Sequence, residues 1–283
     1  MSGLFRKLAA CLLAIALLAG CSTAFTYNQL DWLIPWYVDD YVDLSRDQRK
    51  LLRGQLSSVL QWHREQELVN YIAILDRIES DLSQPVEAAT VQSWIDEITS
   101  AGQRVEESMM PVALGFGAKI STEQMEEFTA SLWERQREAE EEFLSRSEQE
   151  YIRESHDNLV DFLERFTGRL SSAQKQRLLL AASSLHRFDA AWLDDRANWL
   201  TRLEPLLQRP EGWQDAVIAA YGKRRESRTP EYNEILDHNL QVTTVAVADV
   251  LNDLTGKQRR HAAKEIGSLR STLQKLISKS KSA

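Results

Sequence analysis

Long runs of apolar residues spaced three and four positions apart constrain this chain more than any other sequence feature. That spacing places apolar side chains on one face of a helix. Few segments alternate with a period of two, and the chain contains only 11 Gly and 6 Pro. The sequence therefore predicts an all-α fold, an elongated bundle of long antiparallel helices. The expected helical ranges are 45–82, 87–109, 121–166, 171–207, 213–221, 231–251 and 255–277.

Four of these helices begin with the same short pattern: an aliphatic residue, a Ser or Thr, two variable positions and a Gln. The pattern occupies residues 44–48, 120–124, 170–174 and 254–258. Read locally, the hydroxyl is a helix N-cap and the Gln completes a capping box. The pattern also resembles the short repeat of small helical periplasmic chaperones that hold unfolded outer-membrane clients. Its unequal spacing argues against a solenoid.

The expected helices have interruptions at specific positions. Pro35 predicts two short turns in place of one helix before residue 45, and Met110-Pro111 predicts a bend after the 87–109 helix. The 121–166 helix has a highly charged middle, which we expect to project as a solvated rod before Gly168 ends the helix. The 171–207 helix should pair with it as an antiparallel hairpin. A subdomain boundary is possible near the basic linker 222–230.

The N-terminus has the layout of a lipoprotein signal peptide. Arg6 and Lys7 precede an uninterrupted apolar run over residues 8–19, too short to span a bilayer. The run ends in Leu-Ala-Gly-Cys at 18–21, which resembles the lipobox of bacterial lipoproteins, cut before an acylated cysteine. We therefore expect residues 1–20 to be removed and Cys21 to be lipidated. An ordinary secretory signal cut near residue 19 is the alternative.

The lipobox resemblance also implies a location. Ser22 stands where lipoproteins retained in the inner membrane usually carry Asp, so the expected location is the outer membrane, lipid-anchored and facing the periplasm. The only other cysteine, Cys11, would leave with the signal peptide, so no disulfide is expected. The formal net charge of −8 disfavours a nucleic-acid partner.

An aromatic connector links the lipidation site to the helical domain that we place at 45–283. It occupies residues 21–44 and concentrates aromatic side chains between Phe25 and Tyr41. Three interpretations compete: contact with lipid headgroups, a hot spot for a protein partner, or a cap on the helical core. The candidate membrane-interface or partner contacts are Tyr27, Trp32, Trp36, Tyr37 and Tyr41.

The connector also carries a family resemblance. The segment Tyr-Asn-Gln-Leu-Asp-Trp-Leu-Ile-Pro-Trp-Tyr at 27–37, followed by Asp-Asp-Tyr-Val at 39–42, is similar to that of an uncharacterised family of Gram-negative lipoproteins whose domain has no known function. The resemblance implies a wholly helical mature region at the outer membrane. It implies no activity and no catalytic residue.

The sequence offers little catalytic chemistry. The five histidines are scattered, and the pairs His63 with Glu67 and Glu234 with His238 have the spacing of helical ion pairs more often than of metal ligands. No hydrolase or phosphate-loop motif is found. We expect no catalytic residue, metal or cofactor, and a non-catalytic scaffold or adaptor that binds an envelope protein. The alternatives are a client-binding periplasmic chaperone and, third, an envelope hydrolase.

Overall fold

The computed structural model describes residues 25–280, and this part of the chain contains helices and turns but no β-strand. The all-α prediction is confirmed. In chain order the helices are α3 (Leu30–Asp39), α4 (Arg46–Trp62), the π-helical turn η1 (His63–Glu67), α5 (Leu68–Asp81), α6 (Ala88–Gly117), α7 (Thr122–Leu144), α8 (Glu148–Thr167), α9 (Ser172–Ser184), α10 (Asp189–Leu207), α11 (Trp213–Gly222), α12 (Pro230–Asn252) and α13 (Gly256–Ser280).

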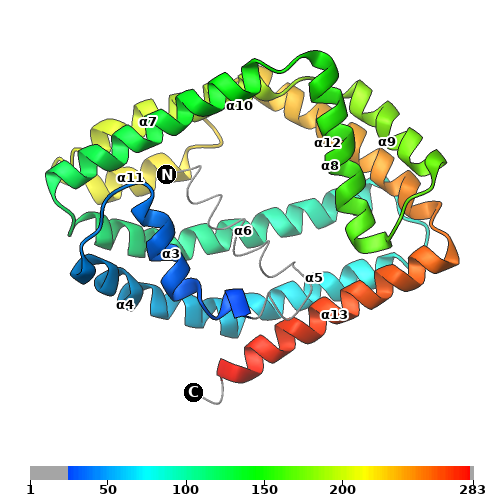
Figure 1. The fold of residues 1–283 in the computed structure, drawn as a ribbon, viewed down its shortest axis with the longest axis horizontal. Coiled ribbons are helices and arrows are strands. Elements are labelled where there is room, and N and C mark those ends of the chain that lie inside the picture. Colours follow the sequence, from blue (N-terminus) through cyan, green and yellow to red (C-terminus); the bar gives the residue numbers. More distant parts are fainter. Residues whose placement is uncertain (1–24, 281–283) are drawn as a thin grey trace.

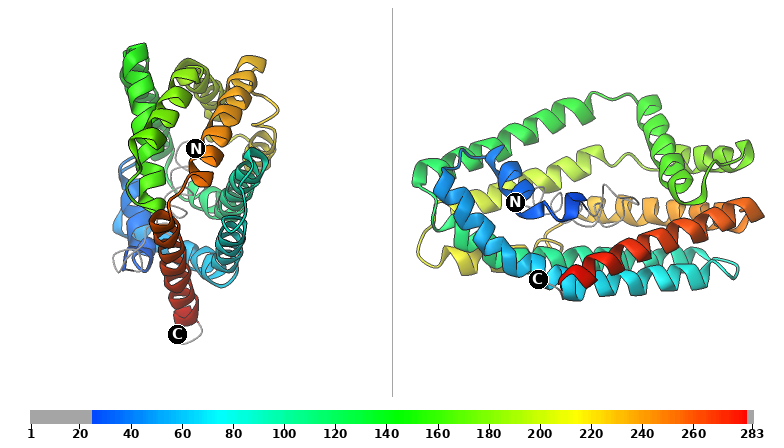
Figure 2. Two further views of the ribbon diagram at one scale, coloured as in Figure 1. Left: turned by 90° about the vertical axis from the view of Figure 1, so that its right-hand side faces the viewer. Right: turned by 60° about the horizontal axis from the view of Figure 1, so that its bottom comes forward.

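The helices follow the outline of an elongated ring (Figure 1). One long side consists of α7 and α10, which lie antiparallel to each other, and the other consists of α4, α5, α6 and α13. Helices α8, α9 and α12 pack together at one end, while α3, α11 and the starts of α4 and α7 lie at the other. Two further views show the same arrangement (Figure 2).

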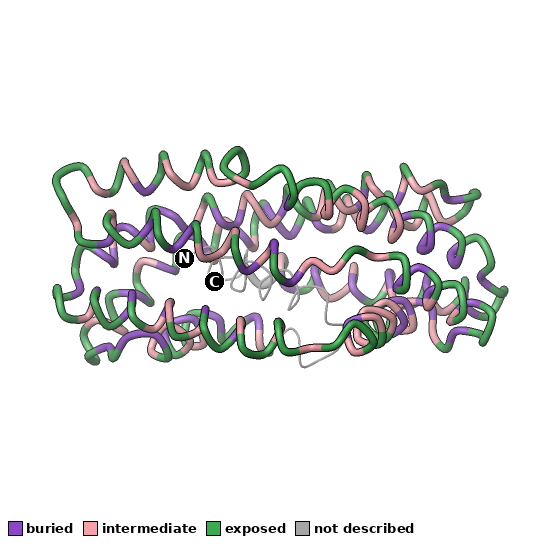
Figure 3. Tube along the Cα trace, turned by 90° about the horizontal axis from the view of Figure 1, so that it is seen from above, coloured by how far each residue is buried: buried purple, intermediate pink, exposed green. Residues whose placement is uncertain are grey.

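Buried apolar residues form two clusters, and Figure 3 shows that buried positions recur along the helices between exposed ones. The larger cluster joins α3, α4, α5, α7, α11 and α13 with the C-terminal halves of α6 and α10. The smaller one joins α8, α9 and α12 with the start of α6. Ile78 and Leu82, at the end of α5, pack against both clusters and so connect them.

The four repeated helix starts are all capping boxes. At Ser45, Ser121, Ser171 and Thr255 the hydroxyl oxygen accepts a hydrogen bond from the backbone N–H of the Gln three residues later, and that Gln oxygen accepts one from the backbone N–H of the cap residue. The preceding aliphatic residues, Leu44, Ile120, Leu170 and Leu254, are buried. The local interpretation of the pattern is confirmed.

The capping boxes also associate in two pairs. We call the first junction I: Gln48 Nε2 donates to Gln124 Oε1 over 2.7 Å, and Gln124 Nε2 donates to Gln48 Oε1 over 2.9 Å. In junction II, Gln174 and Gln258 exchange the same two hydrogen bonds, over 3.4 and 3.0 Å. Each Gln pair therefore fixes two helix N-termini against each other, α4 with α7 and α9 with α13.

Three predictions for the N-terminal half need correction: an unbroken α-helix over 45–82, two short turns around Pro35, and a bend at Pro111. The 45–82 run is helical over Arg46–Asp81, but it contains the π-helical turn η1, which the pattern did not predict. Pro35 lies inside α3, and Pro111 lies inside α6, which continues to Gly117. Each proline removes one backbone N–H donor. The carbonyls concerned belong to Asp31 and Glu107, which are exposed residues, so water can replace the hydrogen bond.

Two predicted long helices are each broken into two. The 121–166 range divides at Ser145–Ser147 into α7 and α8, and the 171–207 range divides at residues 185–188 into α9 and α10. Arg187 donates to the carbonyl of Phe143 over 2.9 Å, and Arg146 pairs with Asp189 over 2.5 Å. The two breaks are therefore held together by contacts between residues distant in the sequence.

One side of the charged middle of the 121–166 range packs against α10, which corrects part of the prediction of a solvated rod, while most residues of this stretch remain exposed. Gln136 and Ala139 are buried on α7 against α10, and Gln136 Nε2 donates to the carbonyl of Leu193 over 3.1 Å. The hairpin prediction is confirmed in a different form, because α8 packs on α9 and α7 packs on α10. Gly168 follows α8 with a φ of 73°, a left-handed conformation that suits glycine and ends the helix as predicted.

Candidate functional site

The structure separates the predicted aromatic contacts into a buried and an exposed set. Tyr27 and Tyr41 are buried, and Tyr37 is half-buried. Trp32 and Trp36 remain exposed, with 48% and 55% of their surface accessible. Two tyrosines of the connector thus pack as a cap on the core, whereas the two tryptophans face outward. Cys21 and the signal peptide lie outside the described residues, so the lipidation prediction stays a prediction.

Trp32 and Trp36 form one aromatic surface on α3. Residues four apart lie on the same face of a helix, and the two indole rings stack with their centroids 6.5 Å apart and their planes 8° from parallel. Phe25, just before α3, is 69% exposed. The other side of the helix packs into the larger apolar cluster through Leu30 and Ile34. The aromatic surface is therefore presented by a helix that the core holds in place.

Tyr27 anchors the start of the connector to a buried histidine. Its hydroxyl lies 2.8 Å from His63 Nδ1, and the opposite ring nitrogen, Nε2, lies 3.2 Å from the hydroxyl of Tyr71. Burial lowers the pKa of His63 to about 4 and raises the pKa of Tyr27 to about 12. A neutral imidazole has one N–H donor and one acceptor nitrogen, so two tyrosine hydroxyls satisfy it completely.

The π-helical turn η1 carries both His63 and the buried Glu67. Arg104 of α6 donates to both carboxylate oxygens of Glu67, over 2.9 and 2.6 Å, and Asn70 donates a third hydrogen bond over 3.1 Å. His63 and Glu67 are four residues apart, but their side chains therefore belong to two separate hydrogen-bond networks. Among the described residues, no group of three or more His, Cys, Asp or Glu side chains could hold a metal ion.

The end of α3 is fixed to its neighbours by polar contacts. The Tyr41 hydroxyl lies 3.1 Å from that of Tyr37, and the Arg135 guanidinium of α7 lies 4.1 Å from the centroid of the Tyr41 ring. Arg49 of α4 donates to both oxygens of Asp39 over 2.7 Å. These contacts orient α3, and with it the exposed tryptophans, relative to the helical domain. The sequence did not predict them, because Arg135 lies far along the chain and the pairing of Arg49 with Asp39 depends on how α3 and α4 pack.

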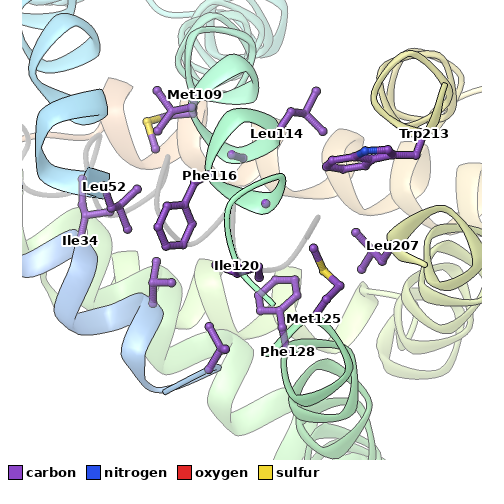
Figure 4. Close-up of a pocket in the computed structure, with 15 residues that line it drawn as sticks. Ile34, Leu52, Met109, Leu114, Phe116, Ile120, Met125, Phe128, Leu207 and Trp213 are labelled. Atoms are coloured by element: carbon purple, nitrogen blue, oxygen red, sulfur yellow. The ribbon is translucent and has the colours of Figure 1, made fainter. Parts of the chain in front are cut away.

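An apolar cavity of about 90 Å³ lies behind α3 (Figure 4). Side chains from five helices converge on it: Ile34 and Val38 from α3, Leu52 from α4, Met125 and Phe128 from α7, Leu207 from α10 and Trp213 from α11. The C-terminal half of α6 supplies most of the remaining wall. The cavity thus adjoins the same helix that exposes Trp32 and Trp36. No sequence pattern indicated it, because its lining is indistinguishable from ordinary core.

A family model described as a family of unknown function, DUF6279, matches residues 40–233. The chain belongs to this family. The match begins near the end of the connector and covers α4 to α11 with the first residues of α12. This result agrees with the expectation of an uncharacterised family. No curated protein and no solved structure matches the chain in the corresponding comparisons. Within residues 25–280, no helix has the length and apolarity needed to cross a membrane.

Proposed function

We propose that this protein is an outer-membrane lipoprotein that faces the periplasm and acts as a non-catalytic adaptor. Residues 1–20 would be its signal peptide, and the lipid on Cys21 would hold it at the membrane. The helical domain would then bind an envelope protein. The observation that carries the proposal is the stacked and exposed pair Trp32 and Trp36, on a helix that begins nine positions after the lipidation site.

The chemistry of this surface favours a protein partner. Tryptophan is enriched among the few residues that carry most of the binding energy at protein interfaces. Exposed carboxylates flank the pair on the same segment, at Asp31, Asp40 and Asp43. An anionic bilayer surface would repel these charges. The expected partner surface has an apolar centre for the two indoles and basic residues around it.

The aromatic surface can be tested apart from the fold. Because Trp32 and Trp36 are about half exposed, replacing both by Ala should leave the thermal midpoint nearly unchanged while partner binding is lost. Replacing Tyr27 by Phe is the matched control, since that side chain is buried and points to His63. The control should lower stability and leave binding intact in the folded fraction.

Photo-crosslinking in cells identifies the partner. A photoreactive residue at position 36 is compared with one at 162, because Phe162 is also exposed, at 58%, but lies on α8 at the other end of the molecule. One discrete protein adduct from 36 alone supports the adaptor. Many outer-membrane clients would favour the chaperone instead, and adducts with lipid alone would reject the adaptor.

The membrane anchor needs a separate experiment. Cys21→Ser should give an uncleaved or soluble form, whereas the unmodified chain should fractionate with the outer membrane and incorporate a labelled fatty acid. A fully processed, membrane-bound Cys21→Ser variant would reject the lipoprotein part of the proposal. The crosslinking experiment would still test the aromatic surface after that result.

A further inference from the structure

The apolar cavity behind α3 has one polar neighbour of unusual geometry. Arg209 donates hydrogen bonds to the backbone carbonyls of Gly117 and Ile120, over 3.3 and 2.8 Å, and both residues line the cavity. It also donates to the Thr122 hydroxyl over 3.1 Å. Its guanidinium therefore lies beside the cavity wall, near the turn between α6 and α7. Leu207, two residues earlier, lines the cavity itself.

The backbone of Arg209 is strained. Its φ is 59°, and it is the only residue other than glycine with a positive φ in the part of the chain that the structure describes. A left-handed conformation disfavours a residue with a side chain of this size, and such strain gathers at functional sites. Among the described residues, no carboxylate lies within ion-pair distance of its guanidinium. Its charge does act on the exposed Glu123, whose pKa is lowered chiefly by hydrogen bonds with Ser121 and the backbone and, to a smaller degree, by Arg209. A positive charge thus stands beside a cavity with a predominantly apolar lining.

The shape and lining of the cavity restrict what it can hold. An apolar cavity of about 150 Å³ admits a benzene ring. At about 90 Å³ this one is smaller, and an unbranched alkyl chain is the narrowest apolar ligand that could enter it. Met109 and Met125 line it, and flexible methionine side chains can move to lengthen the space. The lining contains no charged side chain to bind an anionic headgroup, so the headgroup would remain at the wall, near Arg209.

We propose that this cavity binds the end of an alkyl chain whose anionic headgroup pairs with Arg209. The ligand class is an anionic amphiphile, either a free fatty acid or an acyl chain of a bilayer lipid. Ile34 and Val38 form part of the wall, so the bound chain contacts the inner side of α3, opposite Trp32 and Trp36. The inference does not depend on an adaptor role or on lipidation of Cys21.

The test is photo-labelling of the full chain in lipid nanodiscs. One arm adds a free fatty acid with a diazirine on its alkyl chain, and a second arm builds the same labelled chain into phosphatidylglycerol of the nanodisc. Mapped adducts should fall on residues that line the cavity, in the 109–128 range or at 213. Labelling of these residues in either arm supports the site. The arm or arms that give it show whether the alkyl chain comes from a free fatty acid, a bilayer lipid or both. Adducts confined to other regions, or none, would overturn it.

Variants separate the cavity from the charge. Ala113→Phe fills the cavity and should abolish labelling there, whereas Ala118→Phe places the same ring on an exposed residue just after α6 and should not. Ala113→Leu is the smaller substitute if the Phe variant does not fold.

Arg209→Gln should reduce labelling by the fatty acid but not by the neutral alcohol with the same chain. Equal labelling of the wild type and both Ala113 variants would reject the cavity, and equal loss of acid and alcohol labelling in Arg209→Gln would reject the headgroup contact.

Discussion

Junctions I and II are built from the same five-residue pattern, yet they lie in different surroundings. In junction I, Gln48 and Gln124 are half-exposed, at the end of the molecule that also holds α3 and the apolar cavity. In junction II, Gln174 and Gln258 are only 1% and 7% exposed. The comparison shows that the pattern determines the local geometry in both surroundings, and it predicts that the fold depends more strongly on the buried junction.

The two apolar clusters should also differ in their response to acid. The larger cluster surrounds His63, and burial lowers the pKa of its imidazole from the usual 6.5 to about 4. Between these values the unfolded chain binds a proton that the folded protein excludes. Stability is therefore full above about pH 6.5, declines as the pH falls, and loses about 3 kcal/mol by pH 4 from this one group.

Hydrogen exchange at pH 7 and pH 4.5 checks this largest expected effect. Protection should fall first in η1 and α5, around His63, and later in α9 and α12 of the smaller cluster. His63→Gln, which has no charge at either pH, is the control and should remove this part of the pH dependence. Uniform loss of protection over both clusters would mean that they unfold as one unit.

The glutamine of the buried junction should matter more than its counterpart. Gln174→Ala removes a hydrogen bond to the carbonyl of Asp253 and, in a buried site, both hydrogen bonds with the Gln258 amide. We expect a loss of about 2 kcal/mol in the free energy of unfolding, against about 1 kcal/mol for Gln124→Ala, where water can replace the lost contacts. Urea unfolding measures both. Equal losses would contradict the role assigned to burial.

How much of this could be read from the sequence depends on how local each feature is. The capping boxes at Ser45, Ser121 and Ser171 were predicted because every group involved lies within four residues. The same is true of the end of α8 at Gly168. Ser147 and Glu150 also form a capping box, and their Ser-x-x-Glu spacing is a capping signal that lies within a charged run.

The features that the sequence did not reveal depend on partners far along the chain. The exchange of hydrogen bonds between Gln48 and Gln124 joins residues 76 positions apart. The contact of Arg187 with Phe143 fixes two helix breaks at once. The connector was predicted only as a set of alternatives, because the same aromatic residues suit a core or a surface. Their division into buried tyrosines and exposed tryptophans required the packed structure.

The N-cap residues offer a control in which the two junctions should agree. Ser45 and Ser171 are both exposed, and each accepts a hydrogen bond from its own helix, over 3.2 Å in both cases. Replacement by Ala should cost about 1 kcal/mol at either position. A thermal or urea series on the two variants measures this. A much larger cost at Ser171 would show that the cap, and not only the glutamine, depends on the buried surroundings.

The smallest expected effect concerns the one N-cap residue of the two junctions that is a threonine, since the other three are serines. Thr255 provides the cap hydroxyl in junction II, with its oxygen 3.3 Å from the backbone nitrogen of Gln258. Ser is a slightly better N-cap than Thr, so Thr255→Ser should raise the free energy of unfolding by at most about a few tenths of a kcal/mol. Because residue 255 is exposed, the lost methyl group should cost little packing. A clear destabilisation in urea would mean that the methyl group contributes contacts, so that junction II depends on packing at its cap as well as on its buried glutamines.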